Sequence, residues 1–547
     1  MRATATLLPL AAAASVYAAA VPASSSPCYD LWKTAPAMLE ALEVYEVQDY
    51  VDGVANFTTN WSTPAYPAPV LDLPPFCRLG AYIHTSNSSK VQFEVWMPHD
   101  WSGRFAMVGN GGMAGGVNFP DMWGPIANYK MAVCSTDTGH NGTSGDGTFL
   151  LNGPETQVDF GYRAVHLTTV YSKKIVKEYY KQAAKHAYWI GCSSGGKQGL
   201  KEVQMYPEDF DGVIAGASAL WWSHLNAQTY RINAIVNSVD SPGYLNRSDY
   251  DVIGKLVLQQ CDGQGTDSLE DGIIENPRAC QPDLEQLSCD APGANATACL
   301  SDAQIKTMYR IWADYHQQNG SFVLSGFEHG AEGLAAFSVN GSPYGPGPDY
   351  FAYQVLNNTE VTAFSANATE MDRLIDIADE TDPGQTNAAD PNIQDFLSRG
   401  KLLTYVGLAD TLIPSGLTIW YYEQVRKALD YPEDLHDSFR MFTMPGMGHC
   451  RSGPGAFNFG GPGQRALRQG GTSTGTSFDK EHDMILAMID WVEKGSAPDM
   501  LIGAKYVGDD KRNGTLLERP HCVYPKQAVY KGGDPNAAAS FECENIL

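Results

Sequence analysis

The sequence of 547 residues is 43% hydrophobic and 18% charged, a composition typical of a folded globular protein rather than a disordered chain. Its length exceeds what a single hydrophobic core usually serves, so we expect a main domain that carries a large insertion. The formal net charge of -25 argues against a nucleic-acid partner, because nucleic-acid phosphates require basic patches.

Residues 1–20 are typical of a secretory signal peptide, with a positive start, an apolar run and then a Ser-rich stretch. The apolar run is shorter than the roughly 20 residues that span a bilayer, so we expect a secreted protein with no membrane partner. The eleven cysteines suit an oxidising compartment, where most should be paired. Glycosylation sequons occur at Asn56, Asn60, Asn87, Asn141, Asn246, Asn295, Asn319, Asn340, Asn357, Asn367 and Asn513.

Residues 21–219 predict the first part of the main domain. Cys28 and Cys77 are the only cysteines available to cross-link its Pro-, Ser- and Thr-rich N-terminal region, so we expect them to form a disulfide. Alternating or apolar runs predict strands at 91–96, 101–108 and 131–134. His140 follows the third strand, and we interpret it as a structural residue rather than a catalytic base.

The run 188–195 predicts a nucleophile elbow, in which a serine sits on a tight turn at the end of a buried strand. Ser193 is the candidate nucleophile, because it has glycines at both flanking positions of the Gly-x-Ser-x-Gly pattern. A helical pattern at 157–185 precedes the elbow, and a helix at 197–205 and a strand at 212–217 follow it. This order of elements is that of an α/β-hydrolase.

The glycine-rich loop 109–116 follows an early strand, where this fold places the first oxyanion-hole amide. Gly111 and Gly112 are the candidate donors in this loop, and the amide of Ser194 is the second donor. A flexible turn without a catalytic role is the alternative interpretation.

Residues 220–395 lose the alternation of strand and helix, and we interpret them as an inserted lid domain. Their cysteines form two close sequential pairs, Cys261 with Cys280 and Cys289 with Cys299. The acidic segment 262–274 lies between the first two cysteines. Its spaced carboxylates fit either a calcium loop or a solvated acidic turn.

Residues 396–547 predict the second part of the main domain, closed by the pair Cys522 and Cys543. A strand at 401–406 leads to Asp410, a strand at 438–442 leads to His449, and a helix at 481–494 should pack on the sheet. Asp410 could instead cap a turn, and His449 could be a loop histidine. The order Ser193, Asp410, His449, each past a strand, favours a catalytic triad.

The chain is similar in several motifs to the fungal tannase and feruloyl esterase family. Cys192-Ser193, Asp410 and His449-Cys450 resemble its Cys-Ser, Asp, His-Cys signature, and the similar segments include 206–212, 405–414 and 491–493. The resemblance implies an α/β-hydrolase fold with a lid, Ser193 as nucleophile, His449 as base and Asp410 as its orienting residue. It also implies a disulfide between Cys192 and Cys450.

The resemblance bears on two further sites. Similar proteins have an N-terminal partner for Cys134 that this sequence lacks, so Cys134 should be a buried free thiol. Family members carry calcium in the lid, which implies a structural Ca²⁺ and no organic cofactor. The segment between Asp262 and Asp267 is longer than the family pattern, which leaves Asp262 in question. The implied ligands are Asp262, Asp267, Asp271 and the carbonyls of Leu269 and Ile273.

The resemblance implies an esterase for hydroxylated aromatic acids, acting on small aromatic esters or feruloylated plant cell-wall oligosaccharides. We expect a feruloyl esterase, with a tannase that cleaves galloyl esters as the alternative; the lid aromatics Trp221, Trp222, Tyr350 and Phe351 are compatible with both. An inactive wall-binding glycoprotein and an enzyme that uses Cys192 as a thiol nucleophile are competing hypotheses. The sequence leaves the oligomeric state open, with a homodimer as one option.

Overall fold

The computed structural model describes residues 26–545 except 62, 265–267, 296–297, 343–344, 360–366, 433–434 and 465–473. The predicted signal peptide therefore lies outside the described residues. Within them, no helix combines the length and apolarity needed to cross a bilayer.

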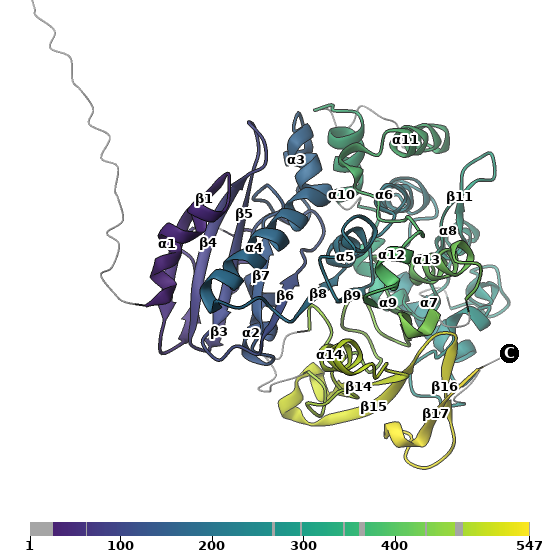
Figure 1. The fold of residues 1–547 in the computed structure, drawn as a ribbon. Helices are drawn as coiled ribbons and strands as arrows, with labels where there is room; N and C mark the ends of the chain where they lie inside the picture. Colours follow the sequence, from purple (N-terminus) through teal and green to yellow (C-terminus); the bar gives the residue numbers. More distant parts are fainter. Residues whose placement is uncertain are drawn as a thin grey trace, which may run out of the picture.

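A nine-stranded sheet forms the centre of the molecule (Figure 1). Its order is β1 (Leu42–Tyr50), β4 (Phe76–His84), β5 (Lys90–Pro98), β7 (Ala132–Thr136), β6 (Arg104–Val108), β8 (His186–Cys192), β9 (Gly212–Gly216), β12 (Lys401–Gly407) and β13 (Phe439–Met444). Strands β1, β4, β5 and β7 pair antiparallel, and every pair from β7 to β13 is parallel. This mixed sheet with helices confirms the α/β-hydrolase fold.

Helices cover both faces of the sheet because successive strand residues point to opposite sides. On β6, Phe105 and Met107 join one buried cluster, and Ala106 and Val108 join the other. The first cluster also contains residues of α1 (Pro27–Met38), α4 (Ala164–Tyr180), α5 (Ser194–Met205) and α13 (Ser415–Ala428). The second contains residues of α2 (Phe119–Ala127) and α14 (Met484–Lys494).

Helix α14 confirms the predicted packing on the sheet but begins three residues later than the hydrophobic pattern suggested. Asp483 is its N-cap, and its carboxylate accepts hydrogen bonds from the amides of Ile485 (3.1 Å) and Leu486 (2.9 Å). A side chain that pairs these amides fixes the first residue of the helix, because they have no partner within it.

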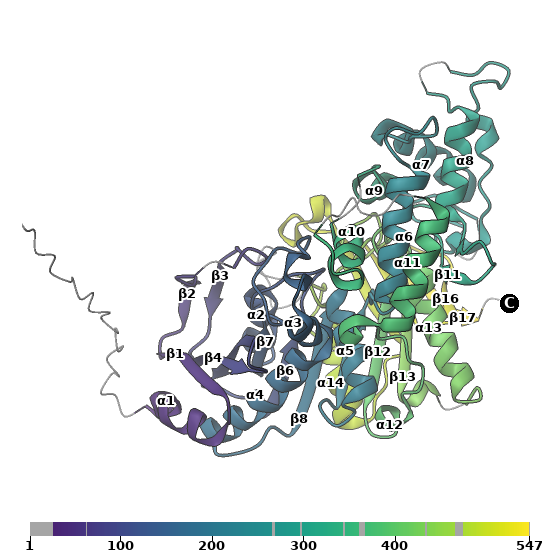
Figure 2. The same cartoon turned by 90° about the horizontal axis from the view of Figure 1, so that it is seen from above.

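The segment between β9 and β12 leaves the sheet, in the region where the sequence predicts a lid. It contains α6 (Trp222–Arg231), α7 (Arg247–Cys261), α8 (Asp302–Trp312), α9 (Glu332–Ser338), α10 (Pro346–Asp349), α11 (Ala368–Thr381), α12 (Gln394–Leu397), β10 (Tyr315–His316) and β11 (Phe322–Leu324). Figure 2 shows α7 and α8 extending away from the sheet. Residues of α7 and α8 share a separate buried cluster, so this part of the insertion has a core of its own.

All five predicted disulfides are present: Cys28–Cys77, Cys192–Cys450, Cys261–Cys280, Cys289–Cys299 and Cys522–Cys543. Cys134 is a buried free thiol, as the resemblance implied. The other strands form small pairs, β2 (Val54–Phe57) with β3 (Val70–Leu73), β14 (Met500–Tyr506) with β15 (Thr515–Cys522), and β16 (Lys526–Tyr530) with β17 (Phe541–Asn545), and a short helix α3 (Pro154–Val158) precedes α4.

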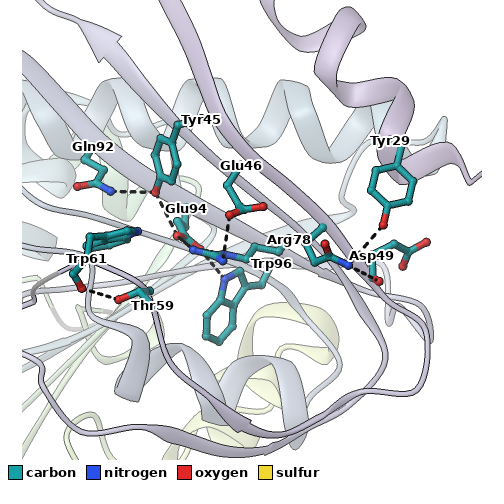
Figure 3. Close-up of polar contacts among 11 residues, drawn as sticks. Tyr29, Tyr45, Glu46, Asp49, Thr59, Trp61, Arg78, Gln92, Glu94 and Trp96 are labelled. Carbon is teal, nitrogen blue, oxygen red and sulfur yellow. Dashed lines mark hydrogen bonds and ion pairs between the residues drawn. The ribbon is translucent and has the colours of Figure 1, made fainter. Parts of the chain in front are cut away.

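A buried ion pair lies between β4 and β5 at the N-terminal edge of the sheet (Figure 3). The Arg78 guanidinium donates to both carboxylate oxygens of Glu94, at 2.8 and 2.6 Å. The Trp96 indole and the Tyr45 hydroxyl donate to the same carboxylate, at 2.9 and 3.1 Å. Glu94 is completely buried, so these donors replace the hydration that the carboxylate loses on folding.

Candidate active site

Ser193 lies on a sharp turn between β8 and α5, as the elbow pattern predicts. Its backbone adopts φ 66° and ψ -126°, a conformation that few residues other than glycine accept. The turn needs glycine at position 191, because a Cβ there would stand 2.3 Å from the carbonyl oxygen of Gly195. The Ser193 amide donates to the carbonyl of Gly216 on β9 at 2.9 Å, which holds the strained turn in place.

Asp410 and His449 lie just past β12 and β13, and they are hydrogen-bonded. His449 Nδ1 lies 2.7 Å from Asp410 Oδ2. The other oxygen of Asp410 accepts from the amides of Leu412 (2.8 Å) and Ile413 (3.0 Å). The Asp410 side chain is completely buried, so the carboxylate is held in one orientation and fixes the imidazole ring beside it.

The disulfide between Cys192 and Cys450 joins the residue before Ser193 to the residue after His449. The two α-carbons lie 6.1 Å apart, within the range that disulfides require. The bond consumes the Cys192 thiol and therefore excludes the hypothesis that Cys192 is the nucleophile.

The glycine-rich loop lies against the start of α5. The hydroxyl of Ser194 donates to the carbonyl of Gly112 at 2.7 Å, and the amide of Asn110 donates to Gln198 Oε1 at 2.9 Å. Gly112 has a φ of 58°, so this position favours glycine. The amide of Gly111 donates to the Tyr66 hydroxyl at 3.1 Å. The oxyanion roles of Gly111, Gly112 and Ser194 stay predictions, and the contact of Tyr66 was not anticipated.

A cavity of about 410 Å³ opens beside Ser193 and His449. Helix α6 of the insertion supplies part of its wall through Trp222, Leu225, Asn226 and Thr229, which share one helix face. The other three aromatic residues noted in the sequence lie outside the cavity wall, because Tyr350 and Phe351 are fully buried and Trp221 stacks on Trp420. Further cavity residues are Gly111, Gly112, Ile232, Asn233, Phe327, Ser338, Val339 and Ile413.

His140 is a structural residue, as predicted from its position before the elbow. Its Nε2 lies 2.8 Å from the carbonyl oxygen of Met113, and its ring stacks on Phe149. Burial lowers the pKa of His140 to about 4, so the ring is neutral at ordinary pH.

The acidic loop of the insertion offers a mixed fit to calcium. Asp267 lies outside the described residues. Asp262 Oδ1 is buried with no hydrogen-bond partner among the described residues, which suits a cation ligand. Asp271 is already engaged, since it forms an ion pair with Arg519 and accepts from the Ile273 amide at 3.1 Å. Asp262, the ligand that the longer loop put in question, is thus the residue with a carboxylate oxygen available to bind a cation.

A strained serine at the end of β8, a hydrogen-bonded Asp-His pair beyond the ends of β12 and β13 and an adjoining cavity define a serine esterase of the α/β-hydrolase fold. The family model "Tannase and feruloyl esterase" matches residues 77–544, and the chain belongs to this family.

Curated and solved relatives agree with this assignment. A probable feruloyl esterase B-1 from Aspergillus flavus is 36% identical over 463 residues, which are 83% of this chain and 84% of that protein. The crystal structure of feruloyl esterase B from Aspergillus oryzae has 32% identity and a TM-score of 0.85, covering 95% of this chain and 99% of that chain. Tannin acyl hydrolase from Aspergillus niger has the same fold, with 23% identity and a TM-score of 0.71, covering 93% and 92%.

Proposed function

We propose that this esterase hydrolyses feruloyl and related hydroxycinnamoyl esters of plant cell-wall polysaccharide and releases ferulic, p-coumaric or caffeic acid. The observation that carries the proposal is the similarity, over most of both chains, to proteins named feruloyl esterase B. The cavity supports it in two ways. Its volume lies in the range of small-molecule sites, and its walls include Leu225, Ile232, Phe327 and Val339, which suit a planar aromatic acyl group.

The reaction follows from the arrangement of the triad. With Nδ1 of His449 engaged by Asp410, Nε2 is the ring nitrogen left to take the Ser193 proton as the serine oxygen attacks the ester carbonyl. The imidazolium then gives this proton to the departing alcohol. Water, deprotonated by His449 in turn, attacks the acyl-enzyme and releases the aromatic acid.

Backbone amides stabilise the negative oxygen of each tetrahedral intermediate. We assign this role to the amide of Ser194, at the start of α5, together with the glycine loop. Each such donor contributes roughly 3 kcal/mol to transition-state stabilisation. Because the Gly111 amide already donates to Tyr66, a substrate carbonyl that uses Gly111 must share that amide with the tyrosine hydroxyl or displace it.

A comparison of methyl ferulate, methyl caffeate, methyl p-coumarate and methyl gallate tests the proposed substrate class. We expect kcat/KM for the hydroxycinnamates to exceed that for the gallate by at least about tenfold. A preference for methyl gallate would assign the chain to the tannase activity of its family. No turnover of any of the four esters, or of a chromogenic short-chain ester, would support the inactive wall-binding glycoprotein.

We further propose that the protein is secreted and glycosylated. All eleven sequon asparagines are exposed to solvent, as attachment of a glycan requires. The side chain of Asn357 also donates to that of Asn152, at 3.1 Å.

We also propose a structural Ca²⁺ in the acidic loop of the lid. Asp262 would hold it, with Asp267, Asp271 and the carbonyls of Leu269 and Ile273 as the remaining ligands implied by the family. Asp271 would have to exchange its ion pair with Arg519 for the cation. A bound Ca²⁺ supplies positive charge to carboxylates that otherwise repel one another, and it cross-links the loop.

A further inference from the structure

Three potential metal ligands meet behind the nucleophile helix, away from the substrate cavity. His166 lies on α4, Glu202 lies near the end of α5, and Asp209 follows in the next turn. Each side chain offers one donor atom, and the three atoms lie within 4.8 Å of one another. None of these residues is among those that line the cavity beside Ser193, so the cluster has no part in the proposed ester hydrolysis.

Glu202 is the unexplained member of this cluster. Glu202 is only 1% exposed, and neither of its carboxylate oxygens has a hydrogen-bond partner among the described residues. A carboxylate that is buried without a donor loses its hydration and gains nothing in return. Burial, together with the nearby charge of Asp209, raises the pKa of Glu202 well above its ordinary value. A cation bound beside Glu202 would favour the ionised carboxylate.

His166 and Asp209, the other two residues of the cluster, are in direct contact. His166 Nδ1 lies 2.7 Å from Asp209 Oδ2, and the imidazole stacks on Tyr206 with ring centroids 3.6 Å apart. Stacking fixes the ring plane, and the His166 side chain is 23% exposed, which leaves a route from solvent.

Lys173 is the nearest cation to this cluster among the contacts of the described residues. It does not donate a hydrogen bond to the Glu202 carboxylate. Its amino group donates to the main-chain carbonyl of Asp209 rather than to a carboxylate. Burial lowers the pKa of Lys173, while the nearby charges of Asp209, Asp211 and Glu202 oppose this shift. The two carboxylates and the imidazole thus remain available to a further cation.

We propose that His166, Glu202 and Asp209 bind a divalent transition cation, with Zn²⁺ as its representative. One imidazole nitrogen and two carboxylate oxygens are a ligand set that Zn²⁺ accepts, at bond lengths of about 2.0–2.2 Å. Such bonds place ligand atoms about 3–4 Å apart, so small side-chain rotations must open the 2.7 Å contact between His166 and Asp209 and bring Glu202 into the same range. Two carboxylates neutralise the ion, and water or the second oxygen of Glu202 completes the coordination.

The consequence is structural. Helix α5 begins at Ser194, directly after the nucleophile, and Glu202 lies near its other end. A cation shared with His166 and Asp209 ties that end of α5 to α4 and to the turn that enters β9. The site would hold the helix that carries the elbow without touching the substrate.

Zinc titration of the chelator-treated full-length protein, in excess Ca²⁺ to keep the lid loop in one state, tests the proposal. We expect one tightly held zinc per chain after dialysis and a rise in Tm of about 2 °C at saturation. Glu202→Gln should hold no zinc and show no Tm rise, while its metal-free Tm equals or exceeds that of the wild type, because glutamine removes the cost of burying an ionisable carboxylate. The matched control is His482→Asn, which removes a partly exposed histidine paired with Asp479 and should keep the zinc.

Two outcomes would overturn the proposal. If the wild-type protein retains no zinc, Glu202 is neutral and shares its proton with Asp209. If Glu202→Gln retains the same zinc and the same Tm rise as the wild type, the metal binds elsewhere. His166→Asn provides a second check, since it should lower zinc retention while leaving kcat on an ester substrate unchanged.

Discussion

Replacing Lys197 by methionine should stabilise the protein, and the gain should depend on pH. Lys197 lies on α5 and is 1% exposed, and its Nζ has no hydrogen-bond acceptor among the described residues. The amino group lies over the rings of Phe160 and Trp222, 4.3 and 4.5 Å from their centroids. These contacts do not replace hydration. Burial, with a smaller effect of the Lys201 charge, lowers the pKa of Lys197 from 10.5 to about 7.

The magnitude follows from this pKa difference. A shift from 10.5 to about 7 is about 3.5 units, which at ~1.4 kcal/mol per unit gives a ceiling of about 5 kcal/mol. Below pH 7 the amine is protonated in both states, so the whole penalty is present. Between about pH 7 and pH 10.5 the unfolded chain holds the proton and the folded chain does not, so folding stability rises with pH. The penalty is gone above that window.

Guanidinium unfolding of Lys197→Met and wild type at about pH 5.5 and about pH 9 measures the effect. We expect the variant to be more stable by several kcal/mol at the lower pH, with the gap shrinking by ~1.4 kcal/mol per pH unit above about pH 7. Lys427→Met, an exposed lysine on α13, is the control and should show no such trend. A variant that is less stable at the lower pH, or a gap that does not change with pH, would refute the reasoning.

Three further predictions concern the buried ion pair, the disulfide and the acidic loop. Glu94→Gln should lower the free energy of unfolding by about 3 kcal/mol, because it leaves the buried Arg78 with only the more distant and partly exposed Glu46, at 3.6 Å, as a counter-charge, whereas Arg78→Met with Glu94→Leu should cost much less; equal losses would contradict this. Removing the bond between Cys192 and Cys450, 258 residues apart, by Ala at both positions should lower kcat far more than it changes KM and remove up to about 5 kcal/mol of unfolded-state restriction. Undiminished kcat would limit the bond to a stability role. EGTA should lower the Tm of the wild type but not that of Asp262→Asn, and no change in Tm or metal content would identify the loop as a solvated turn.

The triad could be predicted from the sequence because each member follows a buried parallel strand. Such strands are apolar on both faces, so the runs before Ser193, Asp410 and His449 are continuous and easily recognised. The turn that holds Ser193 also leaves a local signature in its glycines. Roles that depend on neighbouring residues in the chain can therefore be predicted from the sequence alone.

Contacts between residues far apart in the chain leave no local pattern in the sequence. Tyr66 reaches Gly111 from a loop between β2 and β3, 45 residues away in the chain, and nothing around it distinguishes it from other aromatics. Strand β1 was not anticipated, because most of its residues are only half-buried and its partner β4 lies beyond the β2–β3 segment. Among the lid aromatics, composition alone could not separate Trp222 in the cavity wall from Tyr350 in the core.

Turnover of methyl ferulate by Ser193→Ala is the most direct test of the account. The hydroxyl of Ser193 is the proposed nucleophile, and alanine removes it while the strained backbone of the elbow and the disulfide beside it remain. We expect an unchanged Tm and a loss of kcat by a factor of about 10⁴ or more. A folded variant that keeps more than about one hundredth of the wild-type kcat would contradict the assignment of Ser193 as the nucleophile.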